Sequence, residues 1–322
     1  MPSTVSIVIE WENALLSDVG RARQMLSTLG EQARAYARTH NTRFELLVAY
    51  DPGEIDIAVP RLTVEDELDP ANWPGEVRYV AAPGLHYFEQ KDLGAASTGA
   101  EVVVFLDSDV VPDAGWLGYM LDAIDRPDVQ VVGGHTYLAQ DKLLDRLFSG
   151  FWFFEPNPGQ AGVTRAGHFY ANNVAFRREV LERHRFGHAD SYRGQCIELA
   201  RRLEADGITI WRAADAAVSH PAPDGLRHAL IRAVCQGHDN VYWRRRRPLG
   251  WLHASPLGGA IRLLRSIGKN GATVLSRTRP WGLDPLTAVG SFAFGAGFAL
   301  VIYGSEIVAY FAPGLIRKHV QM

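Results

Sequence analysis

Short apolar runs and longer amphipathic stretches alternate along the first half of the chain. The apolar runs predict β-strands at residues 5–9, 44–49, 77–80, 102–106 and 129–133. Between them, residues 18–39 and 116–124 carry apolar side chains at helical spacing. Strands that alternate with helices are typical of an α/β fold, because parallel neighbours need crossover helices. We therefore expect a mostly parallel sheet flanked by helices.

The second half begins with the same kind of pattern. Residues 197–205 predict a helix, and residues 208–211 and 216–220 predict two further strands. The character changes after His220, where residues 226–242 predict a helix and no further strand follows. We expect the sheet-forming part of the chain to end near this point.

The C-terminal part is basic first and apolar afterwards. Arginines occupy residues 244–247, and a Gly-rich stretch with more Lys and Arg follows. Residues 286–312 are almost uniformly apolar, with Glu306 as their one formal charge, and could span a hydrocarbon core of about 30 Å. We expect this segment to lie in or on a membrane. The alternatives are a buried helical hairpin or an oligomer interface.

These patterns divide the chain into three parts. We expect an α/β domain at residues 1–225, a basic helical or interfacial segment at 226–282 and a hydrophobic, membrane-associated segment at 283–322. The apolar fraction of 47% and the charged fraction of 21% are those of a globular protein, which excludes a disordered chain. The formal net charge of −3 gives no reason to expect nucleic-acid binding.

The cysteines and the N-terminal residues bear on location. Two cysteines, Cys196 and Cys235, are too few for a disulfide framework and lack metal-finger spacing, which favours a reducing compartment. Residues 1–9 have no basic segment before the first strand, so we expect no secretory signal. The chain is expected on the cytoplasmic side of the cell membrane, either peripheral or with a single C-terminal span.

The most informative polar residues follow the apolar run 102–106. Asp107 and Asp109 flank Ser108, a spacing that puts both carboxylates on one face of an extended segment. Ligands of open α/β sheets bind outside the carboxyl ends of strands. Mg²⁺ and Mn²⁺ are often held there by one or two carboxylates and substrate phosphates. The pattern predicts a metal-bound diphosphate, and ordinary turn chemistry is the alternative.

Several motifs in order resemble those of family 2 glycosyltransferases, which are inverting enzymes of the GT-A fold that use nucleotide-activated sugars. The segment Phe105-Leu-Asp-Ser-Asp-Val-Val-Pro112 matches F-L-D-x-D-x-x-P, and the whole resemblance covers roughly residues 4–225. It implies that Asp107 contacts the ribose or the metal and that Asp109 coordinates Mg²⁺ or Mn²⁺ on the diphosphate. His220 ends a segment like P-D-A-x-V-x-H, which implies a metal ligand or a phosphate contact.

The resemblance also implies residues that bind the nucleotide and the sugar. Glu10 replaces the proline that usually follows the first strand, and Asp51 holds the place of an acidic residue that reads the base. Lys91 begins a weakened R-N-x-G motif and would supply positive charge. In the segment 170–178, Asn172 or Asn173 would hydrogen-bond sugar hydroxyls. These residues would bind a UDP- or GDP-sugar.

The expected general base is replaced in this chain. The family shows G-E-D-x-E-L before a helix, whereas Gln195 and Cys196 stand in place of the Glu and the Asp. Gln195 is expected among the residues that bind the nucleotide or the substrate. An alcohol acceptor must lose a proton as it attacks the sugar, so a base is needed. One hypothesis moves the base to Asp190, Glu198, Cys196 or a histidine such as His188. A second gives the enzyme an anionic acceptor, and a third removes catalysis altogether.

The leading hypothesis is an inverting, metal-assisted glycosyltransferase with an acceptor near the membrane. The acceptor, whether a saccharide, a lipid-linked molecule or a small molecule, cannot be identified from the sequence. The alternative is a catalytically impaired protein that binds a nucleotide sugar and partners a membrane transferase. A nucleotidyltransferase is disfavoured because residues 10–13 form no Gly-rich phosphate loop. Arginines 244–247 would bind either anionic lipid headgroups or the diphosphate.

Overall fold

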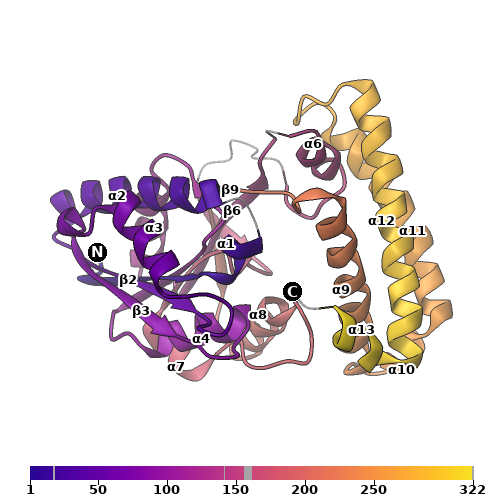
Figure 1. The fold of residues 1–322 in the computed structure, drawn as a ribbon, viewed down its shortest axis with the longest axis horizontal. Coiled ribbons are helices and arrows are strands. Elements are labelled where there is room, and N and C mark those ends of the chain that lie inside the picture. The colour runs from indigo at the N-terminus through magenta and orange to yellow at the C-terminus, as the bar shows by residue number, and fades with distance from the viewer. Residues whose placement is uncertain (17–18, 141, 156–161, 321–322) are drawn as a thin grey trace. The chain divides into compact units, whose positions relative to one another are not determined.

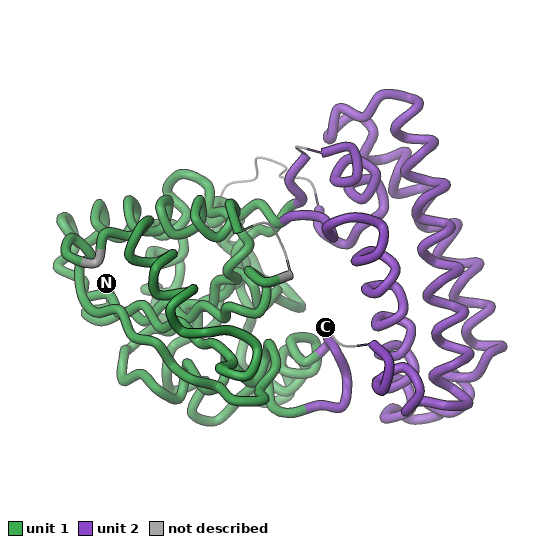
Figure 2. Tube along the Cα trace, viewed as in Figure 1, with its two compact units in different colours: residues 1–137, 159–188, 195–220 green, residues 138–158, 189–194, 221–322 purple. Residues whose placement is uncertain are grey.

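The structure is a computed structural model in which residues 1–16, 19–140, 142–155 and 162–320 are described. They fall into two compact units, coloured green and purple in Figure 2. Unit 1 comprises residues 1–137, 159–188 and 195–220, and unit 2 comprises residues 138–158, 189–194 and 221–322. The division into domains at residues 225 and 282 stays a prediction.

The described strands form one mixed sheet in the order β3-β2-β1-β4-β8-β6-β9-β5, with β7 paired to β9. Their bounds are β1 (Thr4–Glu10), β2 (Arg43–Tyr50), β3 (Gly75–Ala81), β4 (Val102–Asp107), β5 (Val111–Pro112), β6 (Val131–Leu138), β7 (Val163–Ala166), β8 (Asn173–Arg177) and β9 (Ile210–His220). The pairs β3–β2, β2–β1 and β1–β4 are parallel, and β8 lies antiparallel to β4. The sheet is therefore parallel in its first half and antiparallel beyond β4.

The register brings the functional candidates to one edge of the sheet. Glu10 lies opposite Asp107 in the β1–β4 pair and opposite Ala49 in the β1–β2 pair. Ser219 lies opposite Val111 in the antiparallel β5–β9 pair. Carboxyl ends of parallel strands meet at a common edge, so the ends of β1, β2 and β4 lie together there.

Helices cover both faces of this sheet (Figure 1). The helices of unit 1 are α1 (Glu12–Leu16), α2 (Val19–His40), α3 (Ala58–Leu68), α4 (Tyr87–Ala96), α5 (Trp116–Asp125), α7 (Arg178–Arg183) and α8 (Gln195–Ala205), with a 3-10 turn at Pro70–Asn72. Val104 and Leu106 of β4 belong to a core with α2, α3 and α5. Val103 and Phe105 belong to a second core with α4, α7 and α8. Because side chains alternate along a strand, Asp107 follows Phe105 to the α4 side.

Unit 2 is helical in its described residues. Its helices are α6 (Leu143–Ser149), α9 (Gly225–Arg245), α10 (Gly250–Ala254), α11 (Pro256–Arg277), α12 (Pro285–Phe311) and α13 (Pro313–His319). Helix α12 packs against α9, α11 and α6 (Figure 1). Glu306 of α12 is buried, pairs with Arg262 of α11 at 2.8 Å and accepts a hydrogen bond from Asn240 of α9 at 2.8 Å. This ion pair ties the three long helices together.

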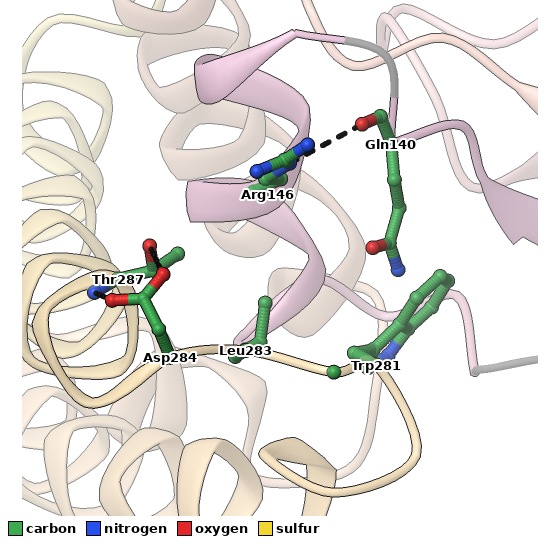
Figure 3. Close-up of a pocket in the computed structure, with 7 residues that line it drawn as sticks. Gln140, Arg146, Trp281, Leu283, Asp284 and Thr287 are labelled. Carbon is green, nitrogen blue, oxygen red and sulfur yellow. Dashed lines mark hydrogen bonds between the residues drawn. The ribbon is translucent and has the colours of Figure 1, made fainter.

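By length and composition, α12 could cross a membrane. Its 27 residues include an 18-residue window of mean hydropathy 1.8, of which 22% is buried. A core helix of a soluble protein passes the same test, so one such helix is weak evidence for a membrane span. Unit 2 also holds a small pocket of about 210 Å³, shown in Figure 3, which lies beside α6 and the α11–α12 turn and contains none of the candidate residues.

Outside the site, the structure differs from the sequence interpretation in the strands expected at residues 208–220. The two strands expected at residues 208–211 and 216–220 are one strand, β9, because β7 pairs with the intervening residues, for example Thr164 with Arg212. The Gly-rich basic stretch is helix α11. Its Gly259 lies where a Cβ atom would come within 2.9 Å of Glu306 and Tyr303, so the small residue allows close packing of α11 on α12.

We expect Gly134→Ala to destabilise unit 1. A Cβ atom at residue 134 would lie 2.2 Å from the carbonyl oxygen of Ala216, which is backbone and cannot move aside cheaply. The expected loss in the free energy of unfolding is about 2 kcal/mol or more, measured by denaturant titration. Gly118→Ala is the control, since its Cβ would meet nothing within 4 Å and α5 would gain helix propensity. Equal stability of the two variants would contradict the packing argument.

Candidate functional site

Asp107, Asp109 and His220 form a cluster at the edge of the sheet. One ligand atom from each residue lies within 4.8 Å of the other two. Asp107 and Asp109 are 3% and 6% exposed, so both carboxylates are removed from bulk water. Two carboxylates and an imidazole are a donor set that suits a divalent cation such as Mg²⁺ or Mn²⁺. The residues present therefore fit the metal that the sequence analysis predicts.

An arginine that the sequence analysis missed holds the two parts of this cluster together. Arg21 of α2 donates from Nε to the backbone oxygen of Asp109 at 2.9 Å and from Nη2 to the backbone oxygen of Ser219 at 2.8 Å. Ser219 precedes His220, so one guanidinium fixes the backbone beside both ligands. Backbone acceptors leave no signal in a sequence, which explains why Arg21 could not be identified.

Asp107 receives three donors, two from α4 and one from α1. Lys91 Nζ lies 2.8 Å from Oδ1, the Tyr87 hydroxyl donates to Oδ1 at 2.7 Å, and Asn13 Nδ2 donates to Oδ2 at 2.9 Å. Lys91 is fully buried. A buried ammonium group requires an anionic partner, so Lys91 acts on the site through Asp107. A direct contact between Lys91 and a nucleotide stays a prediction.

The motif Lys91-Asp-Leu-Gly94 has a structural reason at three of its positions. Lys91 pairs with Asp107, and Asp92 accepts backbone N–H groups of Phe186 and Gly187 at 3.0 and 2.7 Å. A Cβ atom at Gly94 would lie 2.4 Å from the Val8 side chain. Glycine therefore lets α4 lie against β1, which brings Lys91 to the end of β4.

Glu10 lies beside this network and is fully buried. Its carboxyl group accepts hydrogen bonds from the backbone N–H of Asn13 at 3.1 Å and from Asn13 Nδ2 at 2.9 Å. Burial raises the pKa of Glu10 well above its ordinary value, and the nearby Asp107 carboxylate raises it further. Glu10 therefore favours its protonated form in the folded protein.

The residues expected to contact the base and the sugar lie on neighbouring loops. Asp51 follows β2 and accepts backbone N–H groups of Gly53 at 2.8 Å and Gly84 at 3.0 Å, so it joins the loops after β2 and β3. Asn173 is fully buried, and its amide bonds to Trp116 Nε1, His135 O and Ala216 O. The Asn173 amide is therefore used in hydrogen bonds within the protein.

Asn172 is joined to the cluster by a backbone hydrogen bond to Asp107. Its backbone oxygen accepts the Asp107 N–H at 3.4 Å, and its Oδ1 accepts a hydrogen bond from Thr136 at 3.1 Å. The bonds described above use the Nδ2 group of Asn173 but not that of Asn172. The geometry therefore favours Asn172 over Asn173 as the sugar-binding candidate.

The family model described as glycosyl transferase family 2 matches residues 63–185, which include Lys91, Asp107, Asp109 and Asn172. The matched segment spans 123 of the chain's 322 residues, and it is similar to glycosyl transferase family 2.

Solved structures show the same fold at low sequence identity. The chain is similar to mannosyltransferase PcManGT from Pyrobaculum calidifontis in complex with GDP-Man and Mn2+, with a TM-score of 0.53, 16% identity and coverage of 98% of this chain and 86% of that one. It is also similar to GalNAc-T7 with UDP, GalNAc and Mn2+, with a TM-score of 0.50, 13% identity and coverage of 69% of this chain and 44% of that one. No curated protein sequence matches the chain. The expected GT-A-type α/β fold with a C-terminal helical part is confirmed.

The residues near the place of the family's base motif have different surroundings. Glu198 pairs with Arg201 on α8, and Asp190 of unit 2 pairs with Arg317 at 2.6 Å. Cys196 is half-buried and packs against the core that contains Phe105. His188 is exposed and pairs with Glu89 at 2.8 Å. The two carboxylates and His188 thus each have a salt-bridge partner, and which of these residues acts as base stays a prediction.

Gln195, the first residue of α8, is 6% exposed. Within the part of the chain that the structure describes, its Oε1 atom is buried and accepts no hydrogen bond. A buried acceptor without a donor costs about 1 to 3 kcal/mol, so a ligand hydroxyl that donates to it would be stabilising. This supports the prediction that Gln195 contacts substrate.

We expect Glu10→Gln to change how stability depends on pH. Because the folded-state pKa of Glu10 is raised, the folded protein holds a proton that the unfolded chain releases, and the stability from this proton is lost as pH rises above the ordinary value towards the raised one. The amide cannot ionise and avoids this loss. The melting temperature of the variant relative to the native protein should therefore rise between about pH 5 and about pH 8, measured in EDTA. A constant difference would contradict a raised pKa.

Proposed function

We propose that the protein transfers a sugar from a UDP- or GDP-sugar to an acceptor near the membrane, with inversion at the anomeric carbon. The cluster of Asp107, Asp109 and His220 at the edge of the sheet carries this proposal. The family match supports glycosyl transfer, and two structures of the same fold were solved with a nucleotide or nucleotide sugar and Mn2+.

In this proposal, Asp109 and His220 hold Mg²⁺ or Mn²⁺, and Asp107 contacts the ribose or the metal. The divalent cation supplies charge stabilisation for the diphosphate leaving group. Lys91 offsets the charge of Asp107, which reduces the repulsion between Asp107 and a bound diphosphate. Asp51 contacts the nucleobase, and Asn172 and Gln195 orient hydroxyl groups of the substrates.

The proposed reaction is a single displacement. The bond between the anomeric carbon and the diphosphate oxygen breaks, and its electron pair stays on that oxygen. The acceptor oxygen forms the new bond from the opposite face, and its proton passes to a base. Asp190, Glu198 and Cys196 are the proposed bases in this chain. An anionic acceptor, which carries no proton to remove, is the alternative.

The proposed acceptor is a saccharide, a lipid-linked molecule or a small molecule at the cytoplasmic side of the membrane. The apolar helix α12 and the arginines at residues 244–247 support this location. A second candidate function is a nucleotide-sugar-binding scaffold that partners a membrane transferase. The observation that favours it is Gln195-Cys196, which removes both acidic residues from the place of the family's base motif.

We expect Asp109→Asn to abolish metal-dependent donor turnover. The amide keeps the shape of the side chain but removes a charge from the metal site, so hydrolysis of UDP- and GDP-sugars with Mn²⁺ should fall by at least about 100-fold. Asp122→Asn, an equal charge change at an exposed residue of α5, should leave hydrolysis unchanged. Mn²⁺-dependent nucleotide binding without turnover of any donor by the native protein would favour the scaffold.

Variants of the three proposed bases should separate the mechanisms. Removing the true base should slow transfer to an alcohol acceptor by about 10² to 10⁴-fold while leaving Mn²⁺-dependent nucleotide binding intact. The rate of transfer by Glu198→Gln, Asp190→Asn and Cys196→Ser is compared with that of the native protein, on a panel of saccharide and lipid-linked acceptors. Full transfer by all three variants would exclude these residues as the base and leave a histidine such as His188 or an anionic acceptor.

A further inference from the structure

Helix α11 carries an apolar stripe on its outside. Leu257, Ile261, Leu264 and Leu275 are 70%, 46%, 72% and 79% exposed. Their spacing of four, three and eleven residues places them on one face of the helix. A soluble helix normally turns such a face towards its core. Within the described residues of unit 2, this face points away from the core.

The opposite side of α11 fixes that orientation. Gly259 and Val274 are buried, and Arg262 pairs with Glu306 of α12. Asn270 donates to the backbone oxygen of Gly295 on α12 at 3.3 Å. Small and polar groups therefore face α12, and rotating α11 to bury the leucines would break the buried ion pair. The packing of unit 2 therefore keeps the apolar stripe exposed.

The charge around the stripe has one sign. Residues 240–283 contain nine Lys and Arg residues and no Asp or Glu, although the whole chain has a formal net charge of −3. Arg265 and Lys269 are exposed and lie one turn apart beside the stripe. An apolar stripe edged by cations is typical of helices that lie in the interface of an anionic membrane.

Helix α10 and the residue before it also expose large apolar side chains. Leu249 and Trp251 are 64% and 65% exposed, and Leu252 is 45% exposed. Tryptophan is enriched at membrane–water interfaces because its ring is apolar and its indole N–H is polar. The basic run at residues 244–247 directly precedes this helix.

Two other arrangements fit these observations less well. If two copies paired through the stripe about a two-fold axis, Arg265 and Lys269 would approach the same basic face of the other copy, which is repulsive. If α12 spanned the bilayer, α9 would be drawn in with it, together with its buried His238 and Asp239. Charged groups at that depth are costly.

We propose that α10 and α11 form an interfacial surface that binds an anionic phospholipid bilayer, with the α11 stripe inserted among acyl chains and Arg265 and Lys269 on the phosphates. This inference refines the membrane-proximal acceptor of the proposed function, but it depends on unit 2 and not on donor chemistry. It makes the protein peripheral, with α12 supporting α11 from behind.

The test is sedimentation of the full chain with phosphatidylcholine vesicles, with and without phosphatidylglycerol. We expect binding to the anionic vesicles, release by high salt, a loss of at least about tenfold in Leu264→Glu and about fivefold in each of Arg265→Gln and Lys269→Gln. Leu62→Glu on α3 and Arg183→Gln on α7 change exposed residues of unit 1 in the same way and should bind normally. Unchanged melting temperatures and donor hydrolysis would show that the variants fold.

Three results with vesicles would overturn the inference. They are equal binding to neutral and anionic vesicles, full vesicle binding by Leu264→Glu, and retention on vesicles in high salt, which would indicate an inserted α12. A dimer in solution that Leu264→Glu converts to a monomer would assign the stripe to a second copy instead. Vesicle binding with no donor hydrolysis would count against the proposed function and leave the membrane surface standing.

Discussion

The ion pair between Lys91 and Asp107 is the interaction on which the site depends. Its atoms are 2.8 Å apart, and Lys91 is fully buried. Taking two charges out of water costs several kcal/mol for each ion, and the cost is recovered only when the pair and its hydrogen bonds are complete. Tyr87 and Asn13 donate hydrogen bonds to the Asp107 carboxylate of this pair. The packing of α4 against β1 and the orientation of Asp107 are therefore coupled.

The acidic residues at this edge of the sheet differ in how the protein holds them. Asp107 is held by three donors and serves as the fixed point of the network. Asp109 lies in the following turn, where Arg21 donates to its backbone oxygen. Glu10 has a raised pKa because it is buried beside Asp107. Burial beside Asp107 thus disfavours ionisation of the third carboxyl group at this edge.

Unit 2 uses a second buried ion pair for a different purpose. Arg262 and Glu306 join α11 to α12 and fix the rotation of α11 about its axis. The leucines of α11 are exposed as a consequence. The sequence from residue 240 to residue 283, which supplies the cations beside them, contains no Asp or Glu. In both units, then, a buried charge pair joins a helix to a neighbouring element.

The sequence alone determined the parallel strands and the long helices, and it predicted the family resemblance and the candidate metal-binding residues, because periodicity and short motifs depend on neighbours in the chain. Asp107, Asp109 and His220 were predicted together, and the structure brings them within 4.8 Å. Tertiary structure alone decided the roles of Arg21, Tyr87 and Asn13, the difference between Asn172 and Asn173, and the outward face of α11. These depend on contacts between residues far apart in the chain and on backbone acceptors, which leave no local pattern in the sequence.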